Sequence, residues 1–228
     1  NHVWRAFHGR EQVPHERVAE LYRSKIINFY SKQFAWLDTL FSLPEVSLFT
    51  HLVEGQKKGT VRLGRQNQKV FEDIREMIDE AHRDDSIKRD VKVDPAQFLV
   101  RDPDLAHTLH RFRSGGKKLF ILTNSLWDYT DAVMGFLLNG AMPEYPDWRH
   151  YFDIVVCGAS KPTFFTGAMP FYEVETDGHQ AGALKPLSPA SATFVKGRAY
   201  HGGNLGDFER MAQCGGDRVL YIGDHIYG

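Results

Sequence analysis

The spacing of apolar residues in the first part of the chain predicts helices. Glu16 to Tyr30 and Asp73 to His82 carry apolar side chains at helical intervals. Ser42-Leu43-Pro44-Glu45 is typical of a helix start, with Ser42 as the cap and Glu45 at the capping-box position. The segment from Glu54 to Arg65, rich in Gly, Lys and Gln, is expected to be an exposed loop. We therefore expect residues 1–93 to be mainly helical.

A different pattern begins near residue 94, where short apolar runs alternate with helical stretches. The runs are too short for helices and are continuous rather than alternating: Lys118–Leu122, Phe152–Cys157 and Val219–Ile222. The predicted helices each end at glycine or Asn-Gly: Pro103–Arg113, Tyr129–Leu138 and Leu205–Cys214. This pattern is typical of an α/β fold with a buried parallel sheet. Thr176-Asp177-Gly178 also predicts a hairpin extension within about 171–200.

Composition and charge narrow the class of protein. The 228 residues are 42% hydrophobic and 25% charged, with a formal net charge of −1. With no overall basic field, we expect no nucleic-acid or membrane partner. Cys157 and Cys214 are expected to be reduced packing residues, and no apolar run approaches the ~18 residues of a membrane span. A cytoplasmic location is the resulting expectation.

Polar side chains follow each predicted strand. The first is followed by Thr123-Asn124-Ser125, the second leads to Lys161, and the third leads to Gly223-Asp224. Ligands of open parallel sheets bind at the carboxyl ends of the strands, so we expect these groups to gather at one edge. Hydroxyl, amide, ammonium and carboxylate groups suit a phosphoryl group and Mg²⁺. Taken singly, each also fits a helix cap, a turn or a solvated lysine.

These residues also resemble a known family. Phe120 to Ser125, Lys161 and Tyr221 to Gly228 resemble the second, third and fourth motifs of the haloacid-dehalogenase (HAD) superfamily. Within it the chain most resembles the cytosolic purine 5′-nucleotidases of the IMP- and GMP-preferring type. The blocks that carry this likeness lie between about Phe34 and Gly228: Leu37–Glu45, Tyr129–Asp131, Trp148–Asp153, Lys161–Phe165 and Tyr200–Asn204.

The resemblance implies a HAD-like, Rossmann-type core over residues 94–228 and a largely helical cap over residues 1–93. It implies an enzyme that uses Mg²⁺ to hydrolyse purine nucleoside 5′-monophosphates through an aspartyl-phosphate, and a homo-oligomer. Thr123, Asn124 and Lys161 would be catalytic, Ser125 and Lys88 would join them in binding phosphate, and Asp224 would bind the metal.

The family's nucleophile belongs to an Asp-x-Asp pair after an apolar strand, and no such motif occurs here. Asp102-Pro103-Asp104 has the spacing, but it opens a predicted helix. We therefore expect the chain to be part of a longer enzyme and to be inactive by the family mechanism as given.

The predicted base-binding residues are Phe41, Arg75, Asp79 and His82. The last three lie at i, i+4 and i+7, along the edge of an apolar helical stripe. Spacing alone favours an ion pair on a solvated surface, whereas the resemblance implies contacts with a purine. Arg83 stands where the family type has an aromatic residue, which leaves the preferred base open.

Other interpretations stay open. The protein could be a HAD phosphatase for another small phosphate ester, or a non-catalytic nucleotide-binding or oligomerisation module. His107 and His110 lie at i and i+3, as in some metal sites, but no third ligand is evident. The segment Gly202–Gly206 could hold an anion at a helix start, although a flexible loop is the simpler interpretation.

Overall fold

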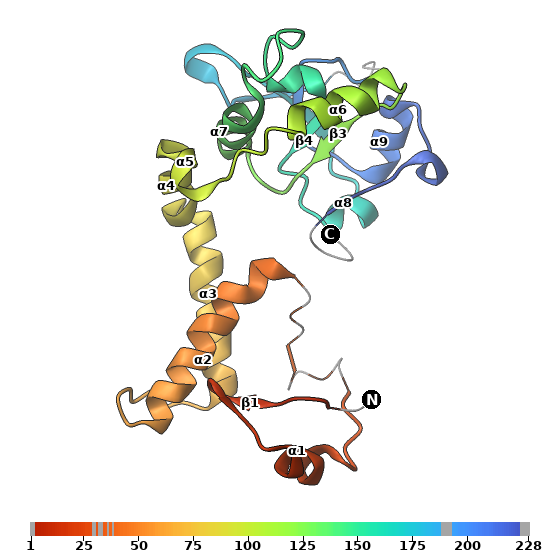
Figure 1. Ribbon diagram of the computed structural model, residues 1–228. Helices are drawn as coiled ribbons and strands as arrows, with labels where there is room; N and C mark the ends of the chain where they lie inside the picture. Colours follow the sequence, from red (N-terminus) through yellow and green to blue (C-terminus); the bar gives the residue numbers. More distant parts are fainter. Residues whose placement is uncertain are drawn as a thin grey trace. The chain divides into compact units, whose positions relative to one another are not determined.

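The computed structural model describes residues 3–28, 31, 34–35, 37, 39–187 and 193–223. The described residues divide into two compact units, one formed by the residues up to 86 together with Gly223 and the other by residues 87–222, shown in Figure 1.

The first unit is built on a pair of packed helices, α2 (Leu43–Lys57) and α3 (Asn67–Arg83). Phe49 and Phe71 meet edge to face between them, with ring centroids 5.5 Å apart. The remaining elements of this unit are short: β1 (Phe7–His8), β2 (Glu11–Gln12), α1 (His15–Tyr22) and the 3-10 helix η1 (Leu40–Ser42).

The predicted helices of this unit are present with different limits. α2 begins after Ser42 with Pro44 in its first turn, but the Ser42 side chain makes no capping hydrogen bond. The prediction of a capping box is therefore wrong. Glu45 is buried, and its carboxylate lies 3.6 Å from Nε of Arg75. α1 ends at Tyr22, before the predicted end at Tyr30. α2 continues to Lys57, so the predicted loop from Glu54 begins too early.

The second unit contains a five-stranded sheet in the order β3-β4-β7-β5-β6. β3 (Phe120–Leu122), β4 (Ile154–Cys157) and β7 (Ala199–Gly202) are parallel, whereas β5 (Phe171–Val174) and β6 (Leu184–Pro186) pair antiparallel. The α/β class is therefore confirmed. The β5–β6 pair forms the hairpin predicted around Thr176–Gly178.

Helices cover both faces of this sheet (Figure 1). Val155 and Cys157 of β4 pack on one face with residues of α6 (Leu105–Ser114) and α7 (Trp127–Leu138), and Ile154 and Val156 pack on the other with α8 (Thr163–Thr166) and α9 (Leu205–Ala212). The other helices are α4 (Ser86–Val93), α5 (Pro95–Phe98), η2 (Trp148–Tyr151), η3 (Gly178–Gln180) and η4 (Gly216–Arg218). Both cysteines are free, as expected, and burial raises the pKa of Cys157 to about 11.

The third predicted strand is wrong. Residues 219–222 carry no strand, and Leu220 and Ile222 are about four-fifths exposed, at 80% and 83%. The strand that pairs with β4 on the side away from β3 is β7, which the sequence pattern did not reveal. A strand forms only where a neighbour supplies hydrogen bonds, and β4 offers that edge to Tyr200 and His201.

In the part of the chain that the structure describes, no helix is long and apolar enough to cross a membrane.

Candidate functional site

The segments that follow β3 and β4 are joined by backbone hydrogen bonds. The Ala159 amide donates to the Thr123 carbonyl at 3.0 Å, and the Gly158 amide donates to the Ser125 carbonyl at 2.8 Å. The Thr123 hydroxyl accepts from the Ser125 amide at 3.1 Å, which leaves its own proton available for donation. The structure thus brings Thr123–Ser125 and the segment leading to Lys161 to one edge of the sheet, as the sequence predicts.

The Asn124 side chain closes this junction. Its Nδ2 donates to the Lys161 carbonyl at 3.0 Å, and its Oδ1 accepts from the Lys161 amide at 2.6 Å. Both polar atoms of the Asn124 amide therefore contact the backbone of Lys161.

The Lys161 ammonium lies beside Tyr221. It donates to the Tyr221 hydroxyl and lies 5.0 Å from the centroid of that ring. The ring in turn stacks on Phe120 of β3, with centroids 6.4 Å apart. Tyr221 precedes Asp224 by three positions, and Asp224, the predicted metal ligand, lies outside the described residues.

The turn between β4 and Lys161 is tight. Gly158 and Ser160 have φ of +56° and +57°, in the left-handed region. The ring of His201 on β7 fills the space next to Gly158, so a Cβ at position 158 would overlap it. Burial lowers the pKa of His201, which favours the neutral ring. The backbone that carries Lys161 is thus supported by Asn124, from the segment after β3, and by His201 of β7.

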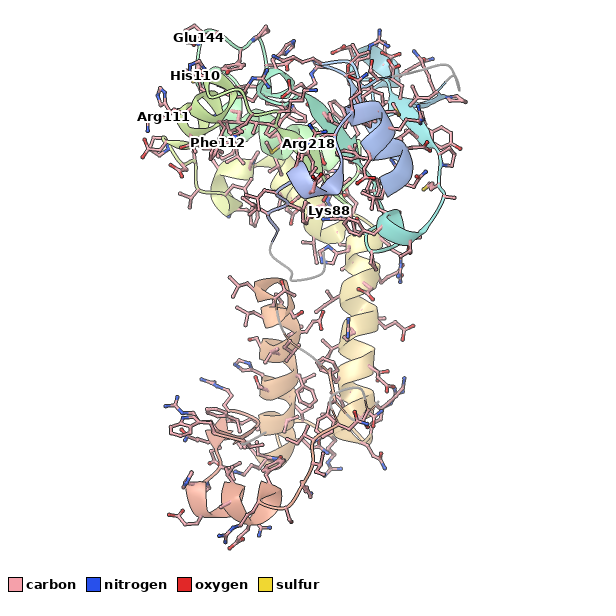
Figure 2. All side chains as sticks on the ribbon, turned by 90° about the vertical axis from the view of Figure 1, so that its right-hand side faces the viewer. Lys88, His110, Arg111, Phe112, Glu144 and Arg218 are labelled. Carbon is pink, nitrogen blue, oxygen red and sulfur yellow. The ribbon has the colours of Figure 1, made fainter. Side chains whose placement is uncertain are left out.

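Lys88 lies on α4 in the second unit and is labelled in Figure 2. Its ammonium is 5.7 Å from the centroid of Tyr129, in the first turn of α7. One turn further along α4, Lys92 pairs with Asp128 at 2.6 Å. Because α7 begins just after Ser125, these contacts hold Lys88 beside the helix that follows the Thr123–Ser125 segment.

The predicted base-binding residues belong to the first unit. Arg75, Asp79 and His82 lie on α3, where Arg75 pairs with Glu45. The side chain of Phe41 lies outside the described residues. An apolar groove of about 300 Å³ between α2 and α3 is lined by Ile74 and Ile78 of α3, together with Leu48, Leu52, Leu63, Arg65, Val70, Asp73 and Met77. On α3, Arg75 and Asp79 come directly after Ile74 and Ile78, and His82 lies four positions after Ile78.

Three minor candidates have structural explanations. Nδ1 and Nε2 of His110 lie 3.0 Å from the Tyr145 hydroxyl and 3.3 Å from the Ser114 hydroxyl. Asp102 accepts from the Asp104 amide at 2.8 Å in the turn before α6. The Gly202–Gly206 segment is not the loop we expected, because β7 reaches Gly202 and Asn204 caps α9.

Two residues that support the Lys161 segment were not predicted from the sequence, because they contact it from distant positions in the chain. His201 and Tyr221 support the Lys161 segment from positions that are 40 and 60 residues further along the chain. No spacing rule links residues so far apart. Among the described residues, no three His, Cys, Asp or Glu side chains gather as a metal site would require.

Comparison with known proteins assigns a family. A sequence model of the 5' nucleotidase family matches residues 1–228. The 5'-nucleotidase domain-containing protein 2 of Homo sapiens is 30% identical over 232 residues, which cover 97% of this chain and 42% of that protein. Its namesake in Rattus norvegicus is 30% identical, with 97% of this chain and 39% of that protein covered.

A 5'-nucleotidase domain-containing protein of Dictyostelium discoideum is 28% identical over 226 residues, covering 97% of this chain and 37% of that protein. The chain thus spans about two-fifths of the length of these relatives. The match to the family model extends over all 228 residues, and the chain therefore belongs to the 5' nucleotidase family.

Proposed function

We propose that the protein containing these residues removes phosphate from purine nucleoside 5′-monophosphates, with a preference for 6-oxopurines such as IMP and GMP. The observation that carries the proposal is the junction at the carboxyl ends of β3 and β4, where Thr123, Ser125 and Lys161 meet. Membership of the 5' nucleotidase family supports the reaction class, and the likeness to purine 5′-nucleotidases supports the substrate.

The proposed phosphate contacts follow from charge. Phosphoryl transfer depends mainly on positioning and on neutralising negative charge. The hydroxyls of Thr123 and Ser125 would donate to phosphoryl oxygens, and the ammonium groups of Lys161 and Lys88 would supply positive charge. Lys161 would exchange its present partner, the Tyr221 hydroxyl, for the phosphoryl group.

The nucleophile in this proposal is an aspartate outside residues 1–228, which forms an aspartyl-phosphate by attack on phosphorus. The nucleoside 5′-oxygen leaves with the P–O bond electrons and takes up a proton. Water then attacks the same phosphorus and loses a proton, which releases phosphate and restores the carboxylate. Mg²⁺, bound with the help of Asp224, would neutralise phosphoryl charge. Asp224 lies outside the described residues.

Base recognition is proposed for α3. Arg75, Asp79 and His82 offer donors and an acceptor along one edge of the helix, and Phe41 would stack on the purine. A 6-oxopurine presents a carbonyl and a ring N–H on its recognition edge, which suit a donor and a carboxylate acceptor.

Phosphate release from IMP, GMP, AMP and UMP by the full-length protein, with and without Mg²⁺, tests the proposal. We expect Mg²⁺-dependent release that favours IMP and GMP and is lost in Asp224→Asn. Substitution of Asp79 by Ala should raise KM for IMP about tenfold or more and change the turnover of a small phosphate ester little.

Release from unrelated phosphate esters alone would contradict the purine substrate and keep the phosphatase. If no ester is hydrolysed, the proposal fails and a non-catalytic module becomes the better interpretation.

A further inference from the structure

Both hydrogen-bonding atoms of the Asn124 side chain contact the same residue, Lys161. Its donor contacts the carbonyl of Lys161 and its acceptor contacts the amide of Lys161, at 3.0 and 2.6 Å. We propose that Asn124 is a positioning residue. It fixes the main chain of Lys161 beyond the carboxyl end of β4 and acts on the phosphoryl group through Lys161. This inference rests on the proposed function. It assigns Asn124 the orientation of Lys161, a proposed phosphate ligand, in place of direct contact with phosphate.

Three consecutive residues after β3 hold three positions of the segment after β4. The carbonyls of Thr123 and Ser125 accept from the amides of Ala159 and Gly158 at 3.0 and 2.8 Å. Those two bonds fix the start of the turn. Asn124 alone among the three reaches Lys161, 37 positions away in the sequence.

Lys161 needs such support because its segment is irregular. Gly158 and Ser160 both adopt a positive φ, and no regular element lies between the end of β4 and the start of α8. A lysine ammonium is a point charge on a flexible four-carbon stem. Fixing the main chain at the base of that stem limits the positions that the charge can occupy, which favours a phosphoryl group held in one place.

The chemistry of the contact requires asparagine. The Lys161 main chain presents one donor and one acceptor, and an amide side chain of this length presents the complementary pair. Aspartate would place a second acceptor against the Lys161 carbonyl, and alanine would remove both bonds. The Thr123 hydroxyl differs, because it accepts from the Ser125 amide and retains its proton for a ligand.

A double-mutant cycle on kcat/KM for IMP, in the full-length protein, tests the inference. Asn124→Ala should lower kcat/KM about 10- to 100-fold, as expected for loss of a residue that orients a ligand-binding group. Lys161→Ala should lower it about 100- to 1,000-fold. If Asn124 acts through Lys161, the double variant should lie within about threefold of Lys161→Ala.

A residue that binds phosphate directly would give a different result. The double variant would then fall below Lys161→Ala by the full factor that Asn124→Ala shows alone. That multiplicative loss, in a protein with normal wild-type turnover, would overturn the positioning role and leave the proposed function intact.

Asn139→Ala is the structural control. Its Oδ1 also accepts a backbone hydrogen bond in the same unit, from the amide of Trp148 nine positions further along the chain, at 2.8 Å. We expect it to lower the melting temperature and leave kcat/KM unchanged. If Asn124→Ala folds poorly, Asn124→Ser takes its place in the cycle.

Binding of inorganic phosphate distinguishes failure of the proposed function from failure of the positioning role. It is measured for the wild type, Asn124→Ala, Lys161→Ala and the double variant. If the wild type hydrolyses no nucleotide, the proposed function fails and the dissociation constants for phosphate form the cycle instead. Loss of affinity in Asn124→Ala that disappears in the Lys161→Ala background supports positioning. Independent losses, or no phosphate binding by the wild type, overturn it.

Discussion

Gly158 occupies a position where the structure leaves no room for a side chain. Its φ is +56°, and a Cβ would overlap Cε1 and Nδ1 of the His201 ring. We expect Gly158→Ala to destabilise the protein by about 2–4 kcal/mol, because left-handed strain adds to overpacking. The shift in the urea unfolding midpoint measures this effect.

Gly140→Ala is the matched control for this prediction. Gly140 also has a positive φ, +71°, but no atom lies within 4 Å of the added Cβ. We expect only the strain, about 1–2 kcal/mol. Equal losses in the two variants would mean that the His201 ring moves aside freely.

Asp147 gives the fold a dependence on pH. Burial alone would raise its pKa, but hydrogen bonds from Arg149 and His150 outweigh burial and hold the pKa below the ordinary 3.8. The Arg149 guanidinium contacts Oδ2 through Nε at 3.0 Å and Nη2 at 2.5 Å. A carboxyl group with a lowered pKa in the folded state stabilises it above the unfolded-state pKa, and this contribution is lost as the pH falls through the folded-state value.

Asp147→Asn tests this pH dependence. The substitution keeps an acceptor for the Arg149 amide but removes the charge, so we expect a loss of about 1–2 kcal/mol at pH 7. The difference from the wild type should shrink below about pH 4. Urea unfolding at pH 7, 5, 4 and 3.5 measures it, and a difference that does not vary with pH would contradict the ionic contribution.

For individual residues, the sequence predicts which polar side chains meet but not which of their atoms make contact. Thr123, Asn124 and Lys161 were predicted to gather because each follows an apolar run that forms a parallel strand. The pairing of the Asn124 side chain with the Lys161 backbone depends on the path of two turns, which no local pattern records. Asp224 lies outside the described residues, so its predicted role stays a prediction.

Among the elements, α9 begins with a side-chain cap. Oδ1 of Asn204 accepts from the Asp207 amide at 3.0 Å, and Nδ2 donates to the Met169 carbonyl at 2.9 Å. We expect Asn204→Ala to cost about 1–2 kcal/mol, because one substitution removes a cap and a bond between two segments. Thermal unfolding measures the loss.

Ser42→Ala is the control for this cap. Ser42 precedes α2 in the position of a cap, but its side chain makes no capping hydrogen bond. We therefore expect a change within about 0.5 kcal/mol. A loss at Ser42 as large as that at Asn204 would mean that residue type, and not the observed bond, decides the effect.

The sequence predicts some of the strands and not others. β3 and β4 lie within the apolar runs that predicted them, since burial on both faces demands continuous apolar residues. Residues 219–222 have the same character and form no strand, whereas Ala199-Tyr200-His201-Gly202 forms β7. Whether a segment becomes a strand depends on the partner edge it reaches, and that information lies outside the segment itself.

For the whole molecule, apolar burial is uneven between the two units. In the described part of residues 1–86, the buried apolar side chains are Val18, Val53, Val70 and Ile74. In the second unit, two clusters of buried apolar side chains lie on opposite faces of the sheet and include large aromatic residues such as Trp148, Tyr151 and Phe164. Because burial of apolar surface is the main stabilising contribution to folding, the two units should differ in local stability.

Hydrogen exchange of the 228-residue chain, measured by mass spectrometry on peptides, tests this difference. We expect amides of α2 and α3 to exchange at least about tenfold faster than those of β4 and α7, since a helix pair with few buried apolar contacts opens at a smaller free-energy cost. The amides of α9, a short helix in the second unit with Phe208, Met211 and Ala212 buried, are the control and should exchange slowly despite its length of 8 residues. Equal protection in α2, α3 and β4 would mean that the two units open together, as one cooperative unit.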